Sequence, residues 1–302
     1  MLKTLCEIPA PSGGEEKLKE FIISELKDSI DLYFEDSFGN LIFVKKGSGD
    51  KKICIECALD EPFLMVSAAN DNKIRYTAPP HIKASYFEDK TVIFPDGETA
   101  LIKSDKKDEK KDSLLHELYT ESKEKVKTGE CVCLEPCYKE IADTVFSFNL
   151  KYKLPILVLM NVIKKVKKPA EEIFFVFSVQ SCLAARGVRA LMQSGISFDK
   201  AISVGCIDEE KENPCLIVKE KSCVLSKSVR ECIEAASLNA GITLDKVLTE
   251  ENFYMKTYLS EGFGAPCGLL CIPSKKGETA FLKSAEMTEK ILALICIKGD
   301  EL

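Results

Sequence analysis

The chain has 302 residues, and its 42 Lys and Arg are outnumbered by 48 Asp and Glu, which gives a formal net charge of −6. Without a basic surplus, nucleic acid is not an expected partner. Apolar residues make up 45% of the chain and charged residues 30%, a globular composition that excludes a disordered or fibrous protein. Histidine occurs only twice, at His81 and His116, so imidazole ligands for a metal are scarce.

The first residues lack the basic start and apolar core of a signal peptide, and no apolar run approaches the ~18 residues of a membrane span. We therefore expect a cytoplasmic protein that does not enter the membrane. The 14 cysteines occur mostly singly in apolar runs, as small reduced hydrophobic residues do. Cys54 and Cys57 form a CxxC in a predicted strand, where they would point to opposite faces rather than form a redox pair. Cys131, Cys133 and Cys137 have no histidine nearby, so a structural zinc site there is the weaker interpretation.

In the N-terminal part, the residue pattern predicts one helix followed by strands. Ser12 and Glu15 have the spacing of a capping box, and the apolar residues behind them recur at helical spacing, which predicts an amphipathic helix over 14–28. Apolar runs then predict strands at 31–36, 41–46, 53–60 and 63–69.

Residues 70–143 differ in composition from the segments on either side. They combine turn signals, short β-like runs and the charged stretch KSDKKDEKKD at 103–112, whose alternating signs indicate a solvated loop. This change predicts a small β-rich domain inserted into a larger one.

The C-terminal half predicts alternating helices and strands. Pro155 suits the first turn of a helix that runs to residue 166. Strands are expected at 173–180, 200–205 and 268–273, and helices at 185–195, 228–241 and 285–297. Such alternation predicts an α/β sandwich.

Six stretches, taken in order, resemble one family. They are IPAPSGGEEKLKEFI (8–22), FGNLI (38–42), ALDEPFLMV (58–66), LYTESKEKVKTGECV (118–132), FVFSVQ (175–180, with Arg186-Gly187 following) and GAPCGLLCIP (264–273). Their order and spacing resemble the tetrahedral cytosolic metallo-aminopeptidases, the co-catalytic zinc peptidases that include glutamyl and deblocking aminopeptidases.

The resemblance implies a fold and an assembly. Residues 1–69 and 144–302 would form a three-layer α/β/α peptidase-like (phosphorylase/hydrolase-like) domain, and residues 70–143 an inserted small β-rich dimerisation domain. We expect a homo-oligomer built through residues 70–143, or a hetero-oligomer with an active paralogue.

In this family two zinc or cobalt ions activate a water, and a Glu serves as general base. The sequence departs from that pattern at every mapped metal position. The former metal-ligand positions are Ala58, Lys151, Cys182, Gly205 and Glu278. The position of the family's general base is occupied by Ser181. Asp60 and Glu61 are retained beside the site. We therefore expect no metal and no other cofactor, and both histidines lie in 70–143, away from the mapped ligands.

Lys151 places a positive charge where the resemblance puts the bridging Asp. An ammonium among metal-free carboxylates would relieve their repulsion, so we hypothesise an ion pair of Lys151 with Asp60 or Glu278. The alternative is simple drift after catalysis was lost.

Loss of the ligands predicts a catalytically inactive homologue of a zinc aminopeptidase. It would act as a structural or regulatory subunit, or bind a peptide or small anion in the old cleft beside Lys151. The alternative is an active metallo-aminopeptidase with an atypical site. That site would use Asp60, Glu61 and Glu278 with one metal, or Cys182 as a nucleophile, although no histidine is expected near Cys182 to activate it.

Overall fold

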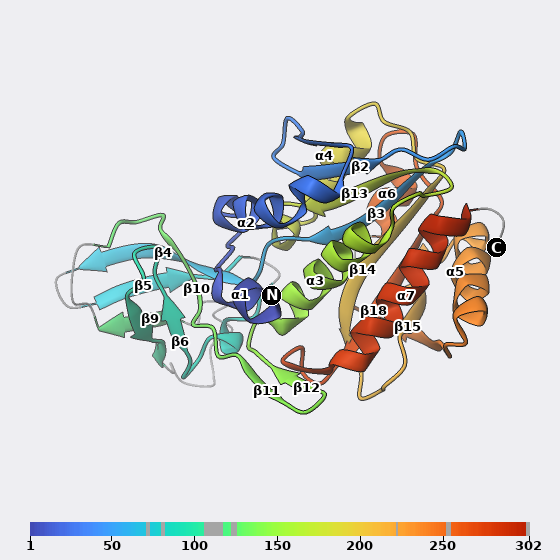
Figure 1. The fold of residues 1–302 in the computed structure, drawn as a ribbon. Helices are drawn as coiled ribbons and strands as arrows, with labels where there is room; N and C mark the ends of the chain where they lie inside the picture. Colours follow the sequence, from blue (N-terminus) through green and yellow to red (C-terminus); the bar gives the residue numbers. More distant parts are fainter. Residues whose placement is uncertain are drawn as a thin grey trace.

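The computed structural model describes residues 1–70, 73–79, 82–105, 117–121, 126–221, 223–251 and 255–299. Within these ranges a nine-stranded mixed sheet forms the centre of the larger part of the molecule (Figure 1). Its order is β1-β2-β13-β3-β14-β18-β15-β16, and β17 pairs with β15. The bounds are β1 Leu32–Glu35, β2 Leu41–Lys45, β3 Lys52–Ala58, β13 Glu172–Ser178, β14 Lys200–Asp208, β15 Cys215–Glu220, β16 Cys223–Val224, β17 Asp245–Thr249 and β18 Cys267–Ser274.

The centre of this sheet is parallel: β13, β3, β14 and β18 run in the same direction. These strands are nearly continuous apolar runs, as expected for strands covered on both faces. Helices α1, α2, α3, α5 and α7 cover one face, and α4 and α6 cover the other. The predicted mixed α/β fold is confirmed. The helices are α1 Leu2–Glu7, α2 Glu16–Leu26, α3 Leu150–Lys165, α4 Arg186–Gln193, α5 Lys227–Ala240, α6 Met255–Ser260 and α7 Leu282–Lys298.

A second, antiparallel sheet of seven strands lies to one side (left in Figure 1) and has its own apolar core. Its order is β7-β6-β10-β4-β5-β9-β8. The bounds are β4 Phe63–Asn70, β5 Lys73–Thr77, β6 Thr91–Ile93, β7 Thr99–Leu101, β8 Lys103–Asp105, β9 Glu117–Glu121 and β10 Cys131–Leu134. A third sheet joins β11 Lys139–Ile141, β12 Thr144–Phe146 and β19 Thr279–Phe281.

The second sheet begins at Phe63. Of the two strands that follow it, β11 pairs with β12, and β12 pairs with C-terminal β19. The division into 1–69 with 144–302 and an insert at 70–143 stays a prediction. His81, His116 and residues 106–112 of the charged stretch lie outside the described residues.

Two local predictions are wrong. Ser12 does not cap α2, because its hydroxyl donates to the Asp60 carboxylate at 2.5 Å and the N-cap is Glu15. Pro155 lies in the interior of α3 rather than in its first turn, because the helix begins at Leu150.

The predicted opposite orientation of Cys54 and Cys57 agrees with the structure. Cys54 and Cys57 point into the cores on opposite faces of the main sheet, as predicted for two residues three positions apart in a strand. All fourteen cysteines are free thiols. Among the helices of the described ranges, none has the length and apolar character needed to cross a membrane.

Candidate functional site

A pocket of about 720 Å³ lies where β3, β13 and β14 approach their carboxyl ends, next to the N-terminal turns of α3. Carboxyl ends of parallel strands meet at one edge of a sheet, which is where pockets of open α/β sheets form. The structure brings five of the mapped positions together around this pocket: Ala58, Lys151, Ser181, Cys182 and Gly205. Asp60 lines it as well.

Glu61 and Glu278 are turned to other partners. Glu61 is 2% exposed and accepts a hydrogen bond from the backbone N–H of Ala10 at 2.9 Å. The Glu278 carboxylate lies 3.0 Å from the Lys90 ammonium, which also faces the aromatic rings of Tyr86 and Phe148. Neither carboxylate lines the pocket.

Lys151 forms an ion pair with Glu251, so the hypothesis that pairs it with Asp60 or Glu278 is wrong. Its backbone N–H donates to the carbonyl of Gly277, and its side chain packs along that glycine, where a Cβ would lie 3.2 Å from Lys151 Cδ. Glu251 comes from the segment after β17. The two residues are 100 positions apart, and nothing in the local sequence around either one indicates the contact.

Lys153 neutralises Glu61, one of the two carboxylates retained beside the site. The sequence analysis did not identify Lys153 as a site residue. Its ammonium is fully buried, lies 3.4 Å from Glu61 Oε1 and donates to the carbonyl of Ile8 at 3.0 Å. A signal was present: Leu150, Lys153 and Leu154 recur at the spacing that places residues on one helix face.

Asp60 is fully buried and holds the loop that follows β13. It accepts hydrogen bonds from the Ser12 hydroxyl at 2.5 Å and from the backbone N–H groups of Ser181 and Cys182 at 2.7 and 2.8 Å. Asp60 therefore fixes the Ser181-Cys182 turn, with its lone pairs engaged by the protein itself.

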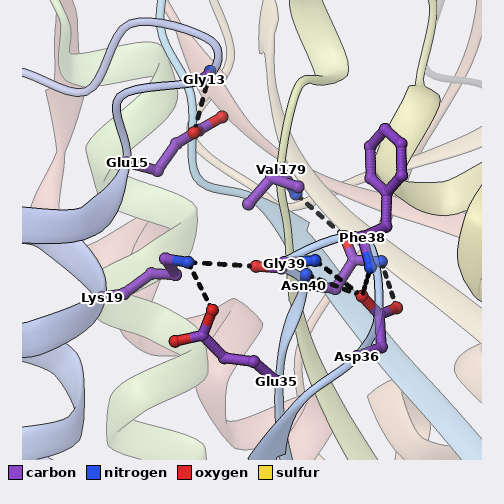
Figure 2. A network of polar contacts seen from close by, with 9 residues as sticks. All are labelled: Gly13, Glu15, Lys19, Glu35, Asp36, Phe38, Gly39, Asn40 and Val179. Atoms are coloured by element: carbon purple, nitrogen blue, oxygen red, sulfur yellow. Dashed lines mark hydrogen bonds and ion pairs between the residues drawn. The ribbon is translucent and has the colours of Figure 1, made fainter.

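A polar network around Asn40 holds the start of the same loop at Val179 (Figure 2). The Asn40 side chain accepts from Val179 N at 3.0 Å and donates to Asp36 at 2.6 Å. Glu15, also drawn there, accepts from Gln180 N at 3.0 Å. Three non-glycine residues of the loop have positive φ: Gln180, Ala184 and Ala185. Backbone strain of this kind persists where the surroundings enforce it, and it is concentrated at functional sites.

Cys182 is unsuited to act as a nucleophile. Burial raises the pKa of its thiol well above the ordinary value, and the neighbouring Asp60 carboxylate raises it further. Burial likewise raises the pKa of Cys206 to about 12. A reactive cysteine requires the opposite, a lowered pKa in an electropositive setting.

Glu56 is a buried carboxylate of the pocket that the sequence reading did not single out. It accepts hydrogen bonds from the hydroxyls of Ser178 at 2.5 Å and Ser203 at 2.6 Å, and the Ser181 hydroxyl lies 3.2 Å from that of Ser178. Burial raises the pKa of Glu56 even though these hydroxyls lower it. The signal was an acidic residue in the middle of the apolar run ICIECA.

The donor set does not fit the two zinc or cobalt ions that the resemblance implies. Ala58 and Gly205 offer no side-chain donor, Lys151 is a cation, and the Cys182 thiol is held protonated. In the described part of the chain, no group of three or more His, Cys, Asp or Glu is arranged to hold a metal ion. Chemistry routed through two metal ions has no structural basis in these residues.

No protein-family model matches the chain. It is 29% identical, over 320 aligned residues, to an Acetivibrio thermocellus protein described as "Putative aminopeptidase", covering 97% of this chain and 96% of the relative. An aminopeptidase from the archaeon Desulfurococcus kamchatkensis superposes with a TM-score of 0.88 at 19% identity, covering 99% of this chain and 94% of that one. The TET1 peptidase of Pyrococcus horikoshii, which can assemble into a tetrahedron or a large octahedral shell, gives 0.85 at 21% identity, covering 98% of both chains. The chain is therefore similar in sequence to a protein described as a putative aminopeptidase, and it shares its fold with solved aminopeptidases.

Proposed function

We propose that this chain is a non-catalytic relative of the zinc aminopeptidases whose pocket binds a small ligand without hydrolysing it. The observation that supports this most strongly is that three carboxylates around the former site are each neutralised by a lysine of the protein. Glu61 pairs with Lys153, Glu278 with Lys90, and Glu251 with Lys151. Divalent cations require uncompensated anionic ligands, and these pairs leave few of them.

The pocket itself supports a binding role. It has the volume of a small-molecule site, and it borders a loop whose strained backbone is held by an extensive hydrogen-bond network. Lys83 and Lys221 line it, and among the described residues neither has an ion-pair partner. They supply positive charge for an anionic group such as a carboxylate. The peptide or small anion expected beside Lys151 is therefore better matched to these two lysines.

We further propose self-assembly through the second sheet. Met65 and Leu101 of that sheet are 38% and 48% exposed, and apolar surface of this kind is covered in closed symmetric oligomers. The assembly described for the TET1 peptidase is consistent with this proposal. A hetero-oligomer with an active paralogue is the second form of the proposal, and co-purification with paralogues separates the two.

The contrary function, an aminopeptidase that removes N-terminal residues from peptides, agrees with the descriptions of the relatives. Aminoacyl-nitroanilides assayed with added zinc or cobalt distinguish the two functions. We expect no hydrolysis above a buffer blank with either metal. Metal-dependent turnover that survives further purification and is abolished by a chelator would establish the contrary function.

A further inference from the structure

We propose that the deep end of the pocket binds a primary ammonium group on a small molecule with an apolar chain, and that Glu56 is the residue that anchors it. The inference rests on the proposed function, because an ammonium can occupy this position only if the pocket does not hold divalent metal ions. It goes further by naming the chemical group recognised and the residue that recognises it.

Glu56 lies on β3, in the middle of the main sheet, with β13 and β14 on either side. Each of its carboxylate oxygens accepts one hydroxyl, from Ser178 and from Ser203, and the Tyr258 hydroxyl is a further neighbour of the carboxylate. A carboxylate has about four lone-pair sites, so acceptor capacity remains even with the Tyr258 hydroxyl counted as a third donor. The Ser203 hydroxyl, which donates to Glu56, also keeps lone pairs that can accept a donor from a ligand.

The residues above Glu56 leave it accessible from the pocket. Ala58 is two positions further along β3, and Gly205 is two positions beyond Ser203 on β14, so both lie on the same face of the sheet as Glu56. All four residues line the pocket. A larger side chain at Ala58 or Gly205 would cover the carboxylate, and the small residues present do not.

In the part of the chain that the structure describes, Glu56 has no protein cation beside it, unlike the buried carboxylates Glu61 and Glu289. Buried Glu61 has Lys153 beside it, and buried Glu289 has Lys165. Within the described ranges, no lysine or arginine lies at ion-pair distance from Glu56, and its charged neighbour Asp60 is an anion that opposes its ionisation. A buried carboxylate loses its hydration, and a proton, hydrogen bonds or a cation can offset that loss. The pocket is the side from which such a cation can come.

A primary ammonium matches the acceptors in number and kind. Its three N–H donors can reach the free lone pairs of the Glu56 carboxylate and the Ser203 hydroxyl oxygen. The walls further out include Pro62, Tyr152, Pro155 and Val204, which suit an apolar chain attached to the ammonium.

Isothermal titration of the full chain with 3-phenylpropylamine and its neutral isostere 3-phenylpropan-1-ol, at about pH 7, tests this directly. We expect the amine to bind roughly tenfold or more tightly than the alcohol, because hydrogen bonds to a charged group exceed neutral ones by about that factor. Glu56→Gln should bring the two affinities together. Glu289→Gln removes an equally buried carboxylate outside the pocket and should preserve the preference.

Ala58→Leu provides a second test that leaves Glu56 unchanged, in case Glu56→Gln disturbs folding. It should weaken amine binding by about tenfold through steric closure of the deep end, with an unchanged circular dichroism spectrum. Equal affinities of amine and alcohol for the unmodified protein, or a preference that survives both Glu56→Gln and Ala58→Leu, would overturn the inference. These results are separate from the metal and hydrolysis assays, which alone decide the proposed function.

Discussion

The Lys153 ammonium lies 3.4 Å from the Glu61 carboxylate, and neither side chain is more than 3% exposed. Lys153 belongs to α3, Glu61 follows β3, and the same two residues hydrogen-bond to Ile8 and Ala10 near the N-terminus. The pair therefore joins three segments beside the pocket. In this pair, Lys153 neutralises the Glu61 carboxylate, which the resemblance places next to a metal ion.

Lys153→Met should destabilise the fold by about 3–5 kcal/mol, because removing one partner leaves the other charge buried and uncompensated. Urea unfolding followed by circular dichroism measures the change. The matched control is Lys3→Met, since Lys3 and Glu7 form an exposed pair and the change should stay within about 0.5 kcal/mol.

The double variant Lys153→Met with Glu61→Leu should recover a large part of the stability lost, because it removes both charges together. If Lys153→Met alone costs no more than Lys3→Met, the buried pair does not have the structural role given to it here.

Lys151→Asp should lower the free energy of unfolding by about 1 kcal/mol. It replaces a partly exposed ion pair with a carboxylate that faces the Glu251 carboxylate. It should not create zinc affinity, since Ala58 and Gly205 still provide no ligand. Lys164→Asp, which breaks the comparable Lys164–Glu25 pair on the surface, is the control for stability. Tight stoichiometric zinc binding by Lys151→Asp would show that the remaining residues do form a metal site.

Glu56→Gln should stabilise the protein increasingly as the pH rises above about 4, the ordinary pKa of a glutamate. Burial raises the pKa of Glu56 in the folded state, so its contribution to stability is complete below the unfolded pKa and is lost as the pH rises through the folded one. Titratable neighbours Asp60, Tyr258, Cys54 and Cys57 are present in both proteins, so the difference isolates Glu56. Urea unfolding across this pH range measures it, and a difference that does not change with pH would contradict the assignment.

Ala184→Gly should stabilise the protein by roughly 0.5–1 kcal/mol, because Ala184 has a φ of +64° that glycine adopts without strain. Ala235→Gly, inside α5, should destabilise it by about 1 kcal/mol. Thermal unfolding compares the two variants. A loss of stability in both would show that the loop conformation carries little strain.

The sequence predicted the sheet well and the polar contacts poorly. Short, continuously apolar runs such as IFFVFSVQ are typical of strands buried on both faces, so β13 and the other parallel strands were predictable from the sequence pattern. The partner of Ser12 was not, because a hydroxyl that could cap its own helix instead reaches Asp60, 48 positions away. The partner of Lys151 was mistaken for the same reason. Ion pairs depend on the placement of loops, which residue spacing does not specify.

The pocket positions show the same contrast. Ala58, Lys151, Cys182 and Gly205 were chosen by resemblance and do lie around one pocket. Glu56 and Lys153 are not among the positions mapped by resemblance. The only sequence signal for them is a charged residue within an apolar stretch that is predicted to be buried.

Elemental analysis of the purified full-length chain, after exposure to excess zinc or cobalt and removal of the unbound metal, tests the central proposal most directly. The lysine-compensated carboxylates and the missing ligands predict no retained metal above a matched blank. Stoichiometric zinc or cobalt, located at the pocket by anomalous scattering, would contradict the account.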